Sequence, residues 1–313
     1  MSIGFIFPGQ GSQAVGMGAD LAKAFPAAKA VFAEVDDALG QTLSTLMWEG
    51  PESELTLTEN AQPALMAVSL AAIRVLGEKG MQLASSVAYV AGHSLGEYSA
   101  LAAAEALSLA DTARLLKTRG RAMQQAVPVG AGAMAALLGA DLAQAQELAQ
   151  AARDGEVCEA ANDNAPGQVV ISGTKAAIDR AIALAPKFGA RRAVLLPVSA
   201  PFHCALMQPA AEVMREALGA VTIKAPSVPL IANVLAAPLT DPDEIRAHLV
   251  QQVTGMVRWR ESMLYLQSQG VSTVYEVGAG RVLTGIARRF DGMEAKSAGT
   301  PEEIEAAATA LAA

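Results

Sequence analysis

Apolar strand-like runs alternate with helical periods along most of the chain. Short apolar runs predict strands at 3–7, 87–90, 229–234 and 273–277. Stretches with apolar residues every three or four positions predict helices, among them 64–76, 109–125 and 204–218. Strands that alternate with helices are typical of an α/β protein with a largely parallel sheet.

Residues 128–199 follow an order of elements of their own. After the linker Pro128-Val129-Gly130-Ala131-Gly132 we expect, in order, a strand, a helix, two strands, a helix and a strand, at 133–138, 141–153, 157–162, 168–172, 175–188 and 193–198. This βαββαβ order is that of the ferredoxin-like split unit. We therefore predict a small ferredoxin-like subdomain at 128–199, inserted into a larger α/β subdomain made of residues 1–127 and 200–313.

The chain contains one G-x-S-x-G pattern, Gly92-His93-Ser94-Leu95-Gly96, between the strand-like run 87–90 and a helix-like run at 95–107. In a nucleophile elbow the serine occupies a tight strand-to-helix turn, where nearby glycines remove side chains that would clash. The hydroxyl then lies outside the sheet, at the positive N-terminal end of a helix. Ser94 is therefore the candidate nucleophile.

A serine hydroxyl needs a base within hydrogen-bond reach, and the histidines are His93, His203 and His248. The side chain of His93 is expected to point away from that of Ser94, and His248 falls among polar residues in a helix predicted at 243–252. His203 lies where the small subdomain returns the chain to the large one, a junction that favours a pocket. His203 is therefore the candidate base.

The sequence does not identify the hydrogen-bond acceptor that orients His203. A serine hydrolase of the α/β type would use an Asp or Glu, but no acidic residue between Ser94 and His203 ends a convincing strand of the large subdomain. The acceptor is then either a backbone carbonyl or an unrecognised carboxylate. A Ser–His dyad is the simpler assumption.

A glycine-rich turn, Phe7-Pro8-Gly9-Gln10-Gly11-Ser12-Gln13, follows the first predicted strand. Gly9, Gly11 and Ala14 fit a relaxed dinucleotide-binding pattern, but residues 27–39 read as a helix where that fold needs a second strand. The turn could instead present backbone amides to the elbow, so that the amides of Gln10 and Leu95 form an oxyanion hole. A plain glycine-rich turn with an exposed glutamine is the third alternative.

Arg119 lies in Lys117-Thr118-Arg119-Gly120-Arg121, on the second helix after the elbow. An arginine on a helix is exposed by default. A buried guanidinium would instead bind a substrate carboxylate through two parallel hydrogen bonds. It would also discriminate against acyl groups without a carboxylate, because leaving the buried charge unpaired costs about 2 to 5 kcal/mol.

Composition narrows the classes of function. A chain of 313 residues with 52% apolar residues can bury a large core, and its net charge of −8 argues against a nucleic-acid binder. We expect a cytoplasmic protein, because no apolar run spans a bilayer and the first residues enter a strand pattern without a basic leader. Cys158 and Cys204 have no metal-ligand spacing, so we expect no metal site, and Cys204 is only a minor alternative nucleophile.

With these motifs in order, the chain resembles the malonyl-CoA:acyl carrier protein transacylases and the related acyltransferase domains of polyketide synthases. The resemblance covers essentially the whole chain. It rests on FPGQGSQ at 7–13, GHSLGEY at 92–98, Arg119-Gly120, NAPGQVVISG at 164–173, Phe202-His203 and YEVG at 275–278.

The resemblance implies an α/β-hydrolase-like large subdomain with a ferredoxin-like insertion, and a dyad whose histidine is oriented by main-chain carbonyls. It assigns Ser94 as nucleophile, His203 as base, Arg119 as the ligand of the malonyl carboxylate, Gln10 and Leu95 as the oxyanion-hole amides, and Gln252 as a pocket glutamine. His93 is counted with the residues of the substrate pocket.

The chain departs from the family pattern at two places. Phe202 stands where many single-domain bacterial members have serine, and in polyketide synthases a phenylalanine there goes with malonyl rather than methylmalonyl selection. The segment Val253-Thr254-Gly255-Met256-Val257 lacks the usual asparagine-proline before its valine. The second departure bears on the local loop and on no catalytic role.

The expected activity is a ping-pong transfer of malonyl from CoA to the phosphopantetheine thiol of acyl carrier protein, without a cofactor and by a monomer. Its partners are malonyl-CoA and acyl carrier protein, with no nucleic acid or membrane. Alternatives are a serine thioesterase, a malonyltransferase of malonate decarboxylation, and a non-enzymatic nucleotide-binding or scaffold protein. An acidic carrier is expected to dock on basic positions, for which the candidates are Lys187, Arg191, Arg192, Arg288 and Arg289.

Overall fold

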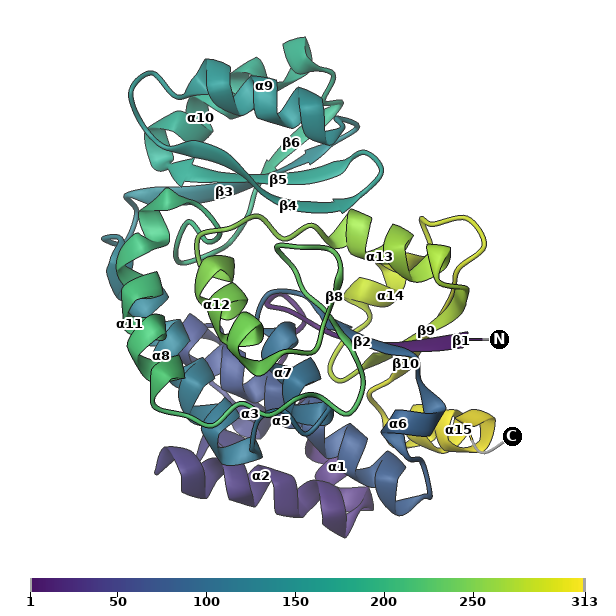
Figure 1. The fold of residues 1–313 in the computed structure, drawn as a ribbon. Helices are drawn as coiled ribbons and strands as arrows, with labels where there is room; N and C mark the ends of the chain where they lie inside the picture. The colour runs from purple at the N-terminus through teal and green to yellow at the C-terminus, as the bar shows by residue number, and fades with distance from the viewer. Residues whose placement is uncertain (1, 312–313) are drawn as a thin grey trace.

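The computed structural model describes residues 2–311, which form two β-sheets with helices around them (Figure 1). Residues 1 and 312–313, the outer ends of the predicted large subdomain, lie outside the described residues. The fold is mixed α/β, as predicted, with one mainly parallel and one antiparallel sheet.

The six-stranded sheet has the order β10-β9-β1-β2-β7-β8, and its neighbouring strands are parallel except for the β7–β8 pair. The strands are β1 (Ser2–Phe7), β2 (Tyr89–Gly92), β7 (Leu230–Ile231), β8 (Pro238–Leu239), β9 (Val271–Val277) and β10 (Glu294–Ala298).

Both faces of this sheet are buried, which explains the continuous apolar runs of the strands. Phe5 and Phe7 of β1 belong to one core and Ile6, between them, belongs to the other, because successive side chains of a strand point to opposite faces. Residues of α5 and α8 contribute to the first core, and residues of α13 and α14 contribute to the second.

The helices around the six-stranded sheet are α1 (Ala19–Ala24), α2 (Pro26–Leu39), α3 (Leu43–Glu49), α4 (Glu52–Leu55), α5 (Thr58–Glu78), α6 (Leu83–Ser86), α7 (Gly96–Ala103), α8 (Leu109–Ala126), α11 (Gln208–Gly219), α12 (Pro242–Gln252), α13 (Trp259–Ser268), α14 (Val282–Ala287) and α15 (Pro301–Leu311). A short 3-10 helix, η2 (Ala205–Met207), precedes α11. Among residues 2–311, none of the helices is long and apolar enough to cross a membrane.

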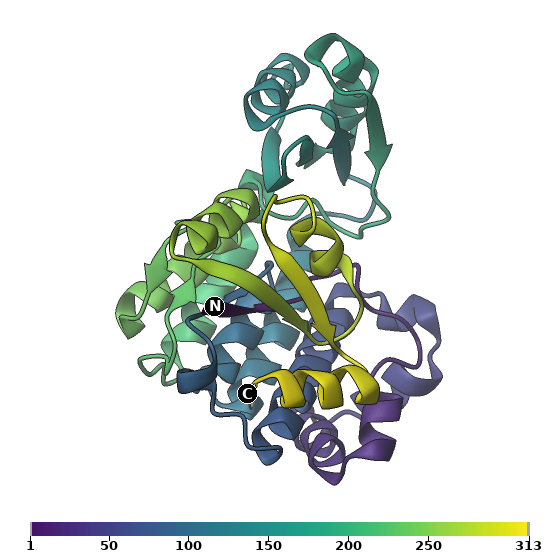
Figure 2. The same ribbon diagram turned by 90° about the vertical axis from the view of Figure 1, so that its right-hand side faces the viewer.

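A four-stranded antiparallel sheet of order β4-β5-β3-β6 stands at one end of the molecule, with α9 and α10 on its outer face (Figures 1 and 2). It has a core of its own, in which Leu137, Ile171 and Ile178 are buried. Its elements are β3 (Gly132–Leu138), α9 (Leu142–Ala152), β4 (Cys158–Ala165), β5 (Gln168–Thr174), α10 (Lys175–Leu184), η1 (Ala185–Phe188) and β6 (Arg192–Leu195). We call residues 132–195 the four-stranded unit.

Several elements end before the pattern predicts: the strand predicted at 193–198 ends at Leu195 and the helix-like run at 95–107 ends at Ala103. A local cause is visible for two others. The strand expected at 229–234 pairs only over Leu230–Ile231, because the chain then turns and Ala236 adopts a left-handed φ of 52° before β8. The helix expected at 175–188 gives way to a 3-10 turn after Leu184, where Pro186 has no amide to continue the α-helical ladder.

Candidate functional site

Ser94 lies in a sharp turn between β2, which ends at Gly92, and α7, which begins at Gly96. Its backbone has a left-handed φ of 54°, a strained conformation for a residue with a side chain. A Cβ atom on Gly92 would lie 1.9 Å from the carbonyl carbon of Gly96, and one on Gly96 would lie 2.3 Å from Phe7 O. The turn is therefore possible only with glycine at both positions, and it leaves Ser94 at the N-terminal end of α7.

His203 is the partner of this serine: Ser94 Oγ lies 2.8 Å from His203 Nε2. The other ring nitrogen, Nδ1, lies 2.9 Å from Gln252 O and 3.1 Å from Gly255 O. Carbonyl oxygens only accept hydrogen bonds, so we assign the proton of neutral His203 to Nδ1, which leaves the Nε2 lone pair facing Ser94. The hydrogen-bond acceptors of His203 Nδ1 are thus two main-chain carbonyl oxygens.

The environment of His203 keeps its ring neutral. Burial, assisted by the positive charge of Arg119, lowers the pKa of His203 to about 3, while the two carbonyls act in the opposite direction. At neutral pH the imidazole is unprotonated and can accept a proton from Ser94.

Arg119 is buried, with 1% of its surface exposed, which overturns the default expectation of an exposed helical arginine. Its Nη1 donates to Gln62 Oε1 at 2.8 Å, and its Nη2 donates to Gln252 Oε1 at 2.8 Å and to Ser94 Oγ at 3.1 Å. Among residues 2–311 no carboxylate forms an ion pair with it, and its buried Nε has no hydrogen-bond partner. The described residues therefore place a cation beside the serine with no carboxylate within ion-pairing distance.

The burial of Arg119 depends on close packing between α5 and α8. A Cβ atom on Gly120 would lie 2.5 Å from Glu59 Cα, so the glycine allows the two helices to approach each other. The ring of Tyr98 also lies beside the guanidinium, with Arg119 Cζ 5.7 Å from the ring centroid.

Gln252 joins the arginine to the elbow, because its Nε2 donates to Ser94 O at 2.9 Å and to Glu97 Oε2 at 2.8 Å. These two acceptors fix the orientation of the amide, so that its Oε1 faces Arg119. Glu97 is itself 1% exposed and accepts a hydrogen bond from Asn233 N at 3.1 Å. Burial raises the pKa of Glu97 to about 7, against the effect of these hydrogen bonds.

Asn233 holds the elbow from the other side: its Oδ1 accepts from Ser94 N at 2.8 Å and its Nδ2 donates to Gly92 O at 2.7 Å. The site residues predicted from the sequence did not include Asn233, Glu97 or Gln62. The sequence does contain features that point to Glu97 and Asn233. Glu97 follows the elbow within GHSLGEY, and Asn233 lies near the end of a predicted strand.

The backbone amides of Gln10 and Leu95 are the predicted oxyanion-hole donors. Within the described part of the chain, neither amide donates a hydrogen bond to a protein acceptor. The glycine-rich turn packs directly on the elbow, since a Cβ atom on Gly9 would lie 2.7 Å from His93 O. The dinucleotide alternative loses its support, because residues 26–39 form helix α2 where that fold requires a strand.

Ser94 and His203 line a cleft of about 490 Å³ between the larger body and the four-stranded unit. Its lining from the larger body includes Gln10, His93, Ser94, Phe202 and His203, and its lining from the four-stranded unit and the connection after it includes Met134, Asn162, Leu196, Pro197 and Val198. The predicted junction between the two parts of the chain is thus where the cleft lies.

The remaining histidines do not contact Ser94 Oγ. The Nε2 atom of His93 lies 2.8 Å from Asn164 Oδ1, and burial lowers the pKa of this histidine. His93 therefore lines the cleft with its ring directed away from the serine hydroxyl, as expected. On α12, His248 is paired with Gln251 Oε1 at 3.0 Å.

Cys204 is a poor candidate nucleophile. Its side chain is buried and its Sγ donates to Pro201 O at 3.2 Å. Burial raises the pKa of this thiol to about 11, so it stays protonated at neutral pH.

The basic residues proposed for docking are all exposed: Lys187, Arg191, Arg192, Arg288 and Arg289. Arg191 and Arg289 line one hollow of about 540 Å³ beside the turn between β4 and β5. Arg289 is held there by Gln168 Oε1 at 2.6 Å and Pro166 O at 2.8 Å.

Comparisons with known proteins agree with one another. A family model described as an acyl transferase domain matches residues 4–304. The chain is 46% identical over 304 residues to the malonyl CoA-acyl carrier protein transacylase of Escherichia coli K12, which covers 97% of both chains.

Two solved structures are similar over nearly the whole chain. One is an acyl-carrier-protein-S-malonyltransferase from Bartonella henselae, with a TM-score of 0.98, 56% identity and 100% of both chains covered. The other is a malonyl-transacylase in complex with a type II PKS acyl carrier protein, with a TM-score of 0.95, 41% identity, and 99% of this chain and 100% of that chain covered.

Proposed function

This chain belongs to the acyl transferase domain family, and we propose that it carries its acyl group between two thiols as an ester of Ser94. It is an enzyme that transfers malonyl from CoA to acyl carrier protein. The observation that carries the mechanism is the buried Arg119, which touches Ser94 Oγ at 3.1 Å and has no carboxylate partner among the described residues.

In the first half of the reaction, the carboxylate of malonyl-CoA binds the Arg119 guanidinium and the thioester carbonyl lies beside Ser94. Nε2 of His203 takes the proton of Ser94 as the hydroxyl attacks the carbonyl carbon. The amides of Gln10 and Leu95 donate to the oxyanion. The tetrahedral intermediate then collapses, the carbon–sulfur bond breaks, and His203 returns the proton to the sulfur of the leaving CoA.

In the second half, His203 removes a proton from the phosphopantetheine thiol of the carrier, and the sulfur attacks the malonyl-serine ester. The same amides hold the second oxyanion, and Ser94 recovers its proton as the ester bond breaks. Arg119 anchors the malonyl carboxylate throughout, which limits the positions from which water could reach the ester.

We also propose that the chain is divided into two subdomains that form opposite walls of the cleft. The large subdomain, 1–127 and 200–313, is α/β-hydrolase-like and supplies the elbow, the base and the arginine. The small subdomain, 128–199, is ferredoxin-like, which the strand order β4-β5-β3-β6 supports, and forms the opposite wall of the cleft. We propose Gln252 as the residue that positions Arg119, and Phe202 and His93 as walls of the acyl pocket.

We also propose that the enzyme works in the cytoplasm as a monomer and needs no cofactor. An acidic carrier would dock on the exposed Lys187, Arg191, Arg192, Arg288 and Arg289. Malonyl transfer in high salt should then slow more with carrier protein as acceptor than with a small neutral thiol.

Product analysis tests the proposed route. The protein is mixed with malonyl-CoA and phosphopantetheinylated carrier, and malonyl-carrier and free malonate are separated and counted. The proposal requires malonyl-carrier as the main product and its loss in Ser94→Ala. Free malonate as the main product would identify a thioesterase, and full transfer by Ser94→Ala would remove the serine ester from the route.

A further inference from the structure

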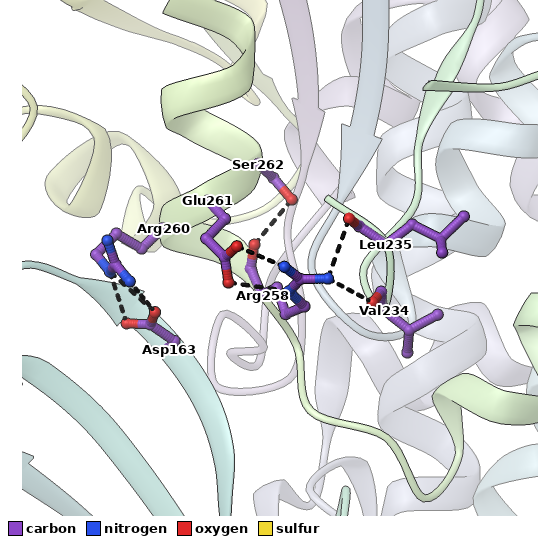
Figure 3. Close-up of polar contacts among 7 residues, drawn as sticks. All are labelled: Asp163, Val234, Leu235, Arg258, Arg260, Glu261 and Ser262. Carbon is purple, nitrogen blue, oxygen red and sulfur yellow. Dashed lines mark hydrogen bonds and ion pairs between the residues drawn. The ribbon is translucent and has the colours of Figure 1, made fainter. Parts of the chain in front are cut away.

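The start of α13 contacts several parts of the site, although none of its residues reaches the cleft. We call residues 257–261 the brace. Arg260 of the brace forms a two-pronged ion pair with Asp163 of β4 (Figure 3): Nη2 lies 2.8 Å from Oδ2, and Nε lies 2.9 and 3.1 Å from the two carboxylate oxygens. Side-chain exposure is 1% for Asp163 and 29% for Arg260.

Main-chain hydrogen bonds join the same two segments. Asp163 N donates to Val257 O at 2.9 Å, and Val257 N donates to Ala161 O at 2.9 Å, which makes a short parallel bridge. The register of β4 against β5 shifts on both sides of residues 162–163, so the part of β4 that meets the brace is flanked by two irregularities. The four-stranded unit is therefore attached to the larger body at this point.

The brace also contacts the loop that holds the elbow. Arg258 N donates to Asn233 O at 2.9 Å, and Arg258 Nη1 donates to the carbonyls of Val234 and Leu235 at 3.3 and 3.2 Å (Figure 3). Glu261 fixes the Arg258 guanidinium from its other edge, with Nε 2.9 Å from Oε1. Immediately before the brace lie Gln252 and Gly255, whose carbonyls face His203 Nδ1.

We propose that the Asp163–Arg260 pair positions His203 for the transfer reaction, by holding β4 and the brace in the register that aims the carbonyls of Gln252 and Gly255 at Nδ1. The proposal rests on the role of His203 as the base. Asp163 and Arg260 are positioning residues, since neither touches the reacting atoms.

The energetics of the pair favour a geometric role. Burial raises the pKa of Asp163 in spite of the hydrogen bonds and the charge of Arg260, so desolvation outweighs the pairing. Ion pairs of this kind add little to the free energy of unfolding, and their best-attested value is to specify a register. The Asp163–Arg260 pair therefore determines the register between β4 and the brace more than it raises the free energy of unfolding.

The variant Asp163→Asn tests this directly, because it removes the charge and keeps the shape. Single-turnover acylation of Ser94 by malonyl-CoA should slow by about ten-fold or more, since small misplacements of catalytic groups have effects of this size. The KM for malonyl-CoA and the preference for malonyl over acetyl should change less than the acylation rate, because Arg119 keeps its hydrogen bond to Gln62 even if Gln252 shifts. Arg260→Gln should slow acylation equally, and the double variant should be no slower than either single one.

The matched control is Glu156→Gln, which breaks the Arg180–Glu156 pair at 2.6 Å within the four-stranded unit. It should acylate at the wild-type rate. The double variant leaves no unpaired charge in the buried position of Asp163, so it still tests the proposal if a single variant fails to fold.

The Nδ1 proton of His203 gives a spectroscopic signature of position. Its NMR resonance should move in Asp163→Asn and Arg260→Gln and stay in place in Glu156→Gln. Wild-type acylation in the two pair variants, or slow acylation with an unmoved resonance, would overturn the positioning role. Failure of the wild-type chain itself to form malonyl-serine would instead count against the proposed function, and the same assay reports it.

Discussion

Replacing Arg119 with alanine should separate malonyl transfer from acetyl transfer. The guanidinium is 1% exposed and, within residues 2–311, is hydrogen-bonded to uncharged groups, so the substrate carboxylate is the anion it can pair with. Removing one partner of a buried, hydrogen-bonded charge pair costs about 2 to 5 kcal/mol. At about 1.4 kcal/mol for each factor of ten, kcat/KM for malonyl-CoA should fall about 30- to 4000-fold.

Acetyl-CoA has no carboxylate and should be affected much less. Its transfer loses the contact of Arg119 Nη2 with Ser94 Oγ and the anchoring of Gln252, each a hydrogen bond to an uncharged acceptor. A net loss of about 1 kcal/mol corresponds to roughly a five-fold fall. The ratio of malonyl to acetyl transfer should therefore drop by about one to three orders of magnitude.

The assay follows transfer of each acyl group from CoA to carrier protein under the same conditions. Arg121→Ala is the matched control: it lies one half-turn further along α8, pairs with Glu59 at 2.6 Å, and is 59% exposed. It should leave the ratio unchanged, since exposed ion pairs contribute little. Equal losses of malonyl and acetyl transfer in Arg119→Ala would refute the carboxylate role and reduce the arginine to a support for Gln252.

Three further outcomes are expected. His203→Ala should slow single-turnover acylation about 10²- to 10⁴-fold, the usual contribution of a general base, and a rate near wild type would point to another base. Gly92→Ala should lower the free energy of unfolding in urea by about 3 kcal/mol or more, because its Cβ would lie 1.9 Å from Gly96, whereas Gly285→Ala, with nothing within 4 Å, should not destabilise the protein. Burial raises the pKa of Glu97 from its usual value of 4.5 to about 7, so the folded chain holds this proton more tightly and stability should fall as pH rises from about 4.5 to 7. Urea titrations should show a smaller fall in Glu97→Gln. Equal slopes in the two proteins would contradict the burial of a carboxyl at this position.

The elbow could be predicted from sequence because its constraint is local. Gly92 and Gly96 are four residues apart, and the overlap that excludes a side chain at Gly92 arises within the turn itself, although the one at Gly96 is with Phe7. The assignment of His203 needed only the prediction that one unit is inserted into another, because the cleft lies where the chain returns. Both inferences depend on order along the chain rather than on distant packing.

The burial of Arg119 and its hydrogen-bond network could not be predicted in this way. Whether Arg119 is buried depends on how closely α8 approaches α5 at Gly120, which is a tertiary contact with residues about sixty positions away. The bond between Asn233 N and Glu97 joins residues 136 positions apart. Local sequence patterns carry no information on such distant pairs. The strand predicted at 229–234 was too long for the same reason, because an apolar run does not show where the chain leaves the sheet to place Asn233.

The most direct test of the central claim is the intact mass of the protein after malonyl-CoA, first alone and then with phosphopantetheinylated carrier. We predict a single malonyl adduct on the wild-type chain, discharge of that adduct to the carrier, and no adduct on Ser94→Ala. An adduct that persists on Ser94→Ala, or transfer to the carrier without any adduct on the wild-type chain, would contradict a malonyl-serine intermediate.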